Sequence, residues 1–243
     1  MTNNLNRTAR TVGALFLISN ATFLIGSAFI LEPLLAAPDY LVQLAQQSSQ
    51  VITGSLLELI NGVAYLGIAV LMFPLFRRRF ESMALGYVSL RIIEFITQIA
   101  ASIVPLLLLS LGKEFVNSGM QDPAAYEAIG ASLLATRYWS YETLYLVFCL
   151  SALLFYTMLY RTKLVPRFVS VWGLIAATLV LINTLLEWFG INLGDAFSMV
   201  TGLPMLLNEL FLGVWLLIKG FSPEADLYPS PSLAAGQGRL SPT

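Results

Sequence analysis

Six long apolar stretches, separated by polar connections, constrain this chain more than any other feature of its sequence. Each is about 20 residues or longer, the length that an α-helix needs to cross a hydrocarbon core of about 30 Å. Only 11% of the 243 residues are charged, whereas a soluble domain has about 25%, so lipid must cover most of the surface. The sequence therefore predicts an all-α bundle of six transmembrane helices, over about residues 12–35, 51–76, 83–111, 131–160, 168–188 and 197–218.

Lysine and arginine lie almost entirely in alternate connections between these spans. Of the 13, ten precede the first span, follow the last, or lie in residues 77–82 and 161–167; Lys113 is alone on the opposite side, and Arg91 and Arg137 fall inside spans. Because basic residues gather on the cytoplasmic side of a membrane, both termini are predicted to be cytoplasmic. The lipid bilayer is the expected partner, and a net charge of -1 gives no reason to expect nucleic-acid binding.

The spans predict one transmembrane domain over residues 1–221. Residues 222–243 are rich in Pro, Ser and Gly and are expected to form a disordered cytoplasmic tail. Residues 112–130 are the longest predicted connection on the opposite side. The first span has no charged residue before Glu32 and is expected to be a peripheral helix.

The chain has no histidine and a single cysteine, Cys149. The absence of histidine excludes His-ligated zinc sites, Ser-His-Asp triads and proton shuttles that use histidine. Cys149 cannot form an internal disulfide. The sequence predicts no metal, no cofactor and no catalytic residue.

Charged residues nevertheless recur inside the apolar spans, where a charge costs about 2.5–3.5 kcal/mol on insertion scales. The third span places Arg91, Glu94 and Gln98 at spacings of three and four residues, which puts them on one helix face. Arg91 and Glu94 can therefore form an ion pair. Such residues are expected to face the interior of the bundle and to mark its functional site.

The other spans contribute further polar residues of the same kind. The predicted ligand- or ion-binding set is Arg91, Glu94, Gln98, Glu58, Asn61, Arg137, Tyr141, Glu142, Asn208 and Glu209. Two arginines cannot neutralise four glutamates, so at least one glutamate must be protonated, bind an external cation or touch water. Glu209 is the preferred candidate because it lies deep and its span contains no arginine. Glu58 and Glu142 lie nearer the outer face, which suggests a polar pocket that opens outward.

This set supports three interpretations. The first is a protein that binds, and moves, a small solute or ion at an acidic polar core; six helices are few for a transporter, so such a protein would act as a homodimer. The second is a membrane scaffold or sensor subunit whose buried polar groups serve packing alone. The third, a carboxylate-based membrane enzyme, has no supporting motif beyond the glutamates.

Four segments carry a family resemblance: Arg10–Ile18, Arg91–Glu94, Tyr160–Arg167 and Glu209–Gly220. In this order they resemble the bacterial membrane proteins grouped as domain of unknown function 4386, over about Arg7–Phe221. The resemblance implies a bacterial inner-membrane protein with several helices. It implies no reaction, substrate or cofactor.

Overall fold

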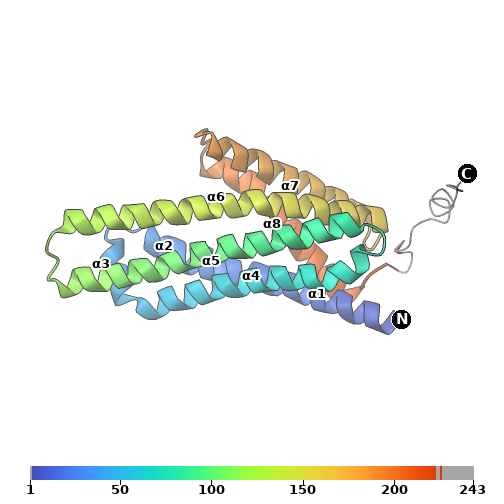
Figure 1. Ribbon diagram of the computed structural model, residues 1–243, viewed down its shortest axis with the longest axis horizontal. Coiled ribbons are helices and arrows are strands. Elements are labelled where there is room, and N and C mark those ends of the chain that lie inside the picture. Colours follow the sequence, from blue (N-terminus) through green and yellow to red (C-terminus); the bar gives the residue numbers. More distant parts are fainter. Residues whose placement is uncertain (1, 223–224, 226–243) are drawn as a thin grey trace, which may run out of the picture.

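The computed structural model describes residues 2–222 and residue 225, and within that part all regular structure is helical (Figure 1). Its elements are α1 (Thr2–Phe23), the π-helical segment η1 (Leu24–Leu31), α2 (Glu32–Leu35), α3 (Tyr40–Gln46), α4 (Ser48–Phe76), α5 (Glu81–Asn117), α6 (Pro123–Thr162), α7 (Arg167–Trp188) and α8 (Asp195–Ile218). Six helical segments are long and apolar enough to cross a membrane, the first running without a break from α1 through α2. The prediction of an all-α fold with six spans is confirmed. The predicted tail lies outside the described residues, apart from Ser222 and Ala225.

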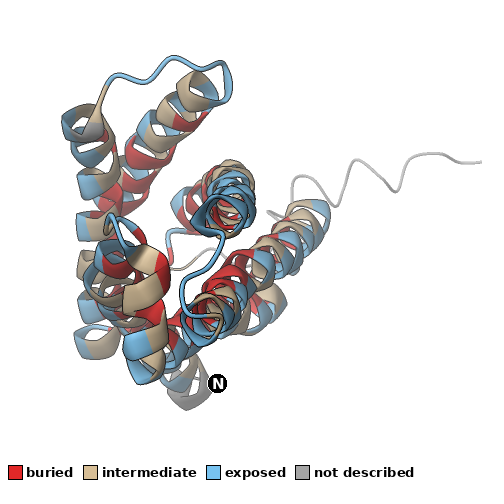
Figure 2. Ribbon diagram, turned by 90° about the vertical axis from the view of Figure 1, so that its left-hand side faces the viewer, coloured by how far each residue is buried: buried red, intermediate tan, exposed pale blue. Residues whose placement is uncertain are grey.

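The six long helices form a closed ring. α1 packs on α4, α4 on α5, α5 on α6, α6 on α7 and α7 on α8, and α8 returns to pack on α1. Buried residues lie on the helix sides that face the interior, and exposed residues cover the outer sides (Figure 2). The expectation that the first span is peripheral is therefore wrong, because α1 is a full member of the ring.

Close contact between α1 and α8 completes the ring. A Cβ atom added to Gly13 would lie 2.6 Å from the carbonyl oxygen of Gly213, and one added to Gly213 would lie 3.1 Å from the carbonyl oxygen of Gly13. Small residues at such a crossing let two helix backbones approach closely. This approach brings the polar side chains of α1, Ser19 and Asn20, into the bundle, where both are buried.

The two ends of the bundle differ in charge. The N-terminus, the α4–α5 and α6–α7 connections and the end of α8 lie at one end, here called the basic end; it holds Arg77–Arg79, Lys163 and Lys219 (Figure 1). The α5–α6 and α7–α8 connections lie toward the other end, here called the far end. α5 and α6 extend past the α7–α8 turn there, since α6 has 40 residues and α7 only 22.

The predicted connection at residues 112–130 is wrong. α5 continues to Asn117 and α6 begins at Pro123, so only residues 118–122 link them. The charged residues of this segment, such as Lys113, Glu114 and Glu127, lie on exposed faces of helices that continue past the apolar stretch. α3, which was not predicted, packs on α5 at Gly112, where any Cβ atom would overlap the backbone of Leu41.

Aromatic side chains fill the interior of the ring toward the basic end. Phe16, Phe76, Tyr87, Phe155 and Tyr156 are all almost fully buried, and their rings contact one another in series at centroid distances of 5.2 to 6.3 Å. This aromatic layer draws on α1, α4, α5 and α6. It closes the interior of the bundle on the basic side.

Candidate functional site

A cavity of about 530 Å³ occupies the interior of the ring beyond the aromatic layer. Every ring helix lines it: α1 with Asn20 and Phe23, α4 with Asn61, Gly62 and Tyr65, α5 with Arg91, Glu94, Phe95 and Gln98, α6 with residues from Tyr138 to Phe148, α7 with residues from Val180 to Glu187, and α8 with residues from Ser198 to Glu209. The volume falls within the range of about 300–1,000 Å³ that small-molecule sites occupy. One chain therefore builds a complete site of ligand size.

The cavity runs along the bundle from its middle toward the far end. Arg91 lies ten residues from the start of α5 and Glu209 nine residues from the end of α8, or about 14–15 Å from the basic end of each helix. Glu142 and Glu187 lie 20 residues from the basic ends of α6 and α7, or about 30 Å. The carboxylates thus form two levels, a deep one and one at the mouth.

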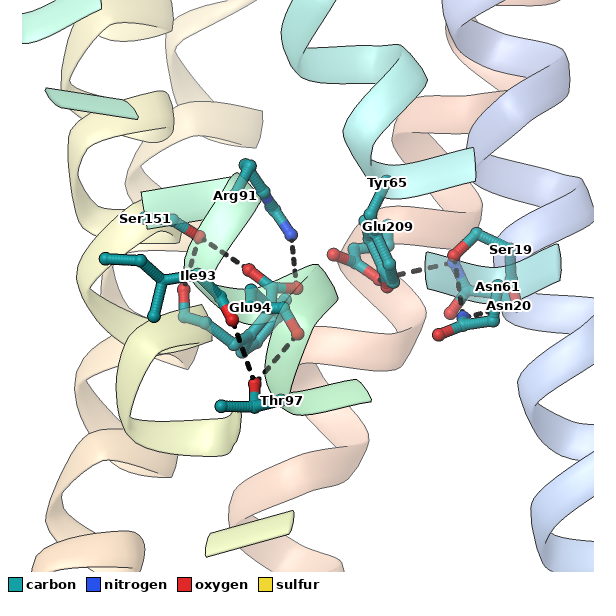
Figure 3. Close-up of polar contacts among 11 residues, drawn as sticks. Ser19, Asn20, Asn61, Tyr65, Arg91, Ile93, Glu94, Thr97, Ser151 and Glu209 are labelled. Atoms are coloured by element: carbon teal, nitrogen blue, oxygen red, sulfur yellow. Dashed lines mark hydrogen bonds and ion pairs between the residues drawn. The ribbon is translucent and has the colours of Figure 1, made fainter. Parts of the chain in front are cut away.

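An ion pair between Arg91 and Glu94 forms the first part of the deep level. The Nη1 atom of Arg91 lies 2.8 Å from Oε1 of Glu94, and the hydroxyl of Ser151 on α6 donates to the other carboxylate oxygen at 3.2 Å (Figure 3). The guanidinium also lies over the rings of Tyr65 and Phe148, 4.7 and 5.5 Å from their centroids. Both members of the pair are buried, so the charge of Arg91 is neutralised within the protein.

Glu209 forms the second part of the deep level, across the ring from Glu94 (Figure 3). Its Oε2 atom accepts hydrogen bonds from the hydroxyl of Tyr65 at 2.7 Å and from the side-chain amide of Asn20 at 3.2 Å. Within the described part of the chain no ion pair reaches Glu209. Tyr65 therefore connects the two parts, since its ring contacts Arg91 and its hydroxyl holds Glu209.

Asn61 and Gln98 are wall residues with polar partners of their own. The amide of Asn61 donates to the carbonyl and the hydroxyl of Ser19, both at 2.9 Å, and so fixes α4 to α1. The amide of Gln98 donates to the hydroxyl of Ser102 on the same helix at 3.1 Å. These bonds satisfy the donors of two buried amides beside the cavity.

The mouth holds the less neutralised carboxylates. Glu142 is partly buried, and its Oε2 atom is inaccessible to solvent and has no hydrogen-bond partner among the described residues. Glu187 accepts long hydrogen bonds from Tyr138 at 3.4 Å and Asn192 at 3.3 Å. Of the residues that line the cavity in the structure, Arg91 is the single cation against four glutamates.

Arg137 belongs to a separate polar cluster beside the cavity. Its guanidinium contacts Glu58 through two hydrogen bonds of 2.6 and 3.2 Å and also reaches Glu32 at 3.2 Å. The hydroxyl of Tyr141 donates at 2.5 Å to Oε1 of Glu58, the oxygen that also accepts the 2.6 Å bond from Arg137. Neither Arg137 nor Glu58 lines the cavity. We call this cluster the Arg137 staple, because it joins α2, α4 and α6.

The structure divides the predicted site residues into two sets. Seven line the cavity, namely Arg91, Glu94, Gln98, Asn61, Tyr141, Glu142 and Glu209. Arg137 and Glu58 form the staple, and Asn208 lies outside the cavity, where its amide donates to the carbonyl of Val169 at 3.0 Å and joins α8 to α7. Asn20 was missed, although an Asn inside an apolar span is a signal that could have identified it.

The arrangement can hold a positive charge, but it does not resemble a metal centre. No group of three or more His, Cys, Asp or Glu side chains converges within the described residues. The four glutamates lie on four different helices and at two levels of the cavity. They can therefore act on separate parts of a ligand rather than on one ion.

Comparisons with known proteins agree with the predicted resemblance. A family model described as a domain of unknown function matches residues 11–220. No curated protein and no solved structure matches the chain. The family match covers most of the chain and all six apolar helices, so this multi-pass membrane protein belongs to the family of domain of unknown function DUF4386.

Proposed function

We propose that this protein binds a small solute or ion in the central cavity and moves it across the membrane. The observation that carries the proposal is the cavity of about 530 Å³ lined by one arginine and four glutamates. Protein interiors are normally packed to the density of organic crystals, and ionisable groups inside a membrane are rare and usually mark a ligand or ion path. A bundle that served packing alone would need neither the space nor the excess of carboxylates.

The aromatic layer indicates from which end of the bundle a solute would enter the cavity. The cavity reaches the mouth glutamates at about 30 Å from the basic end, whereas Phe16, Phe76, Tyr87, Phe155 and Tyr156 close the interior on the other side. This asymmetry supports a site that opens to one side of the membrane. Movement of a solute through the bundle requires that the aromatic layer separate.

The positive-inside distribution supports an orientation with both termini in the cytoplasm and the mouth outside, and the family resemblance supports a placement in a bacterial inner membrane. Cysteine introduced by Gln121→Cys, between α5 and α6, should react with a membrane-impermeant maleimide on intact cells. Cysteine introduced by Ser82→Cys, near the start of α5, should react only after the cells are opened. The reverse pattern would contradict the orientation and leave the cavity itself untouched.

A block of the cavity tests solute binding whatever the chemical identity of the solute. Gly202 lines the cavity, and a Cβ atom added there would meet nothing within 4 Å. We expect that Gly202→Trp fills this space and leaves the fold intact. Small molecules released by denaturation of the purified wild-type protein, identified by mass spectrometry, should include one in near-equal amount to protein that is missing from the Gly202→Trp preparation.

Val200→Trp is the matched control, because Val200 is on the same helix with 68% of its surface exposed. It adds the same indole to the outer face and should keep the released solute. Binding of inorganic ions is tested by the thermal unfolding of both variants in NaCl and in KCl, each compared with a salt-free solution of equal osmolality. If neither a solute nor an ion distinguishes Gly202→Trp from Val200→Trp, the scaffold interpretation replaces the binding one.

A further inference from the structure

The residues that line the cavity also indicate the chemical class of its ligand. This inference rests on the proposed function, since it concerns the same site. The charges that face the cavity are unequal, with Arg91 against Glu94, Glu142, Glu187 and Glu209. An anionic ligand would meet this excess of carboxylates. Arg91 could not compensate for it, because its guanidinium is already paired with Glu94 at 2.8 Å.

Two features disfavour a bare metal ion. Hard cations take six or more oxygen ligands at one centre, whereas the described residues contain no converging group of three ionisable ligands. The wall between the deep and the mouth levels is also largely apolar, with Phe95, Leu144 and Phe148 among its residues. A ligand that fills this space must therefore offer an apolar body.

The mouth offers the counterpart for a positive head group. Glu142 lines the cavity, and no hydrogen bond or ion pair from a described residue reaches its carboxylate. The ring of Tyr145, one helical turn along α6, lines the cavity as well, whereas the adjacent ring of Tyr141 is already covered by the Arg137 guanidinium, 4.8 Å from its centroid. Aromatic faces attract cations, by about 2 kcal/mol or more where water is excluded. A carboxylate beside aromatic rings is a site for an ammonium group rather than for a hydrated inorganic ion.

The protein already uses the same chemistry one level deeper. There the Arg91 cation lies over Tyr65 and Phe148, with Glu94 as its counter-ion. The mouth offers the carboxylate of Glu142 and the ring of Tyr145, and among the described residues no cation lies over that ring. We infer that the cavity binds a monovalent organic cation, whose ammonium group lies at Glu142 beside the ring of Tyr145 and whose apolar body extends toward Phe95 and Phe148.

Phenyltrimethylammonium and benzenesulfonate are suitable probes, because they have similar size and opposite charge and are both soluble in water. Binding to the purified protein in an uncharged detergent is measured by titration calorimetry. The heat measured with the Gly202→Trp variant is subtracted. This variant lies in the same detergent micelle but has no open cavity, so its heat reports the binding of the probe to the micelle. We expect saturable binding of phenyltrimethylammonium and none of benzenesulfonate.

Glu142→Gln should weaken the binding of phenyltrimethylammonium by about tenfold or more, as the loss of an ion pair in a partly dry site predicts. Glu114→Gln removes an exposed carboxylate at the far end of α5, outside the cavity, and should leave the affinity unchanged. Both variants should keep the wild-type unfolding temperature, which shows that the fold is retained.

Equal or tighter binding of benzenesulfonate, or binding of the cation that ignores Glu142→Gln, would overturn the inference. So would the absence of saturable binding of either probe. If a solute is nonetheless released from the wild-type protein and missing from the Gly202→Trp variant, the proposed function stands and only the organic-cation class is rejected.

Discussion

Arg137→Met should destabilise the protein by about 3–5 kcal/mol, the usual result of removing one partner from a buried ion pair. Glu58 is fully buried and loses two hydrogen bonds in this variant. The hydroxyl of Tyr141 and the adjacent backbone then have to accommodate a carboxylate with no cation near it. For a chain of this size the loss corresponds to a fall in the unfolding temperature of about 6–20 °C, measured by thermal unfolding in a mild detergent.

The double variant Arg137→Met, Glu58→Met should recover most of this loss. It removes the stranded charge, and buried ion pairs replaced as a whole by apolar residues are often neutral in stability. Arg77→Met is the control, because Arg77 is exposed at the basic end, where its guanidinium lies over the ring of Phe73 at 5.8 Å. A loss below about 1 kcal/mol for Arg137→Met, or no recovery in the double variant, would show that the staple does not act as a coupled unit.

Arg137 and Arg91 are buried charges of two kinds that the sequence does not distinguish. Arg137 and Arg91 each sit inside an apolar span with glutamates nearby. In the structure the first makes a satisfied cluster beside the cavity, and the second lies on the cavity wall. Sequence spacing could pair Arg91 with Glu94, because the partners are one turn apart on one helix. It could not pair Arg137 with Glu58, which is 79 positions away on another span.

The fold was predictable from the sequence because the membrane leaves few choices. Apolar runs of spanning length predict helices, and six were expected and are present. The helix ends were less predictable at the far end, where α5 and α6 continue through polar residues. In that part the charged residues lie on the exposed faces of α5 and α6, and composition alone does not distinguish such a helix end from a loop.

The order of the helices around the ring was not predictable from hydropathy. The placement of α1 depends on Gly13 facing Gly213, a contact between residues 200 positions apart. That contact brings α1 close enough to α8 for the side-chain amide of Asn20 to donate a hydrogen bond to Glu209. The sequence could identify most of the polar residues that face inward, but which of them share one cavity follows from this packing.

The central claim is that the cavity is open to water from the far end and attracts cations. The most direct measurement is the reaction of Gly202→Cys, with Cys149 replaced by alanine, toward two methanethiosulfonates of similar size. One carries a trimethylammonium group and the other a sulfonate, and each rate is divided by the rate of that reagent with free mercaptoethanol. The control is Val200→Cys on the exposed outer face of α8, which should react slowly with both reagents.

An acidic, water-filled cavity predicts that the normalised rate of the cationic reagent at Gly202→Cys exceeds that of the anionic reagent by about tenfold or more, the scale of electrostatic focusing in a charged cleft. Replacement of Glu142 by Gln should reduce this ratio. A thiol at this position that reacts with neither reagent, or with both at equal normalised rates, would contradict an open and acidic cavity.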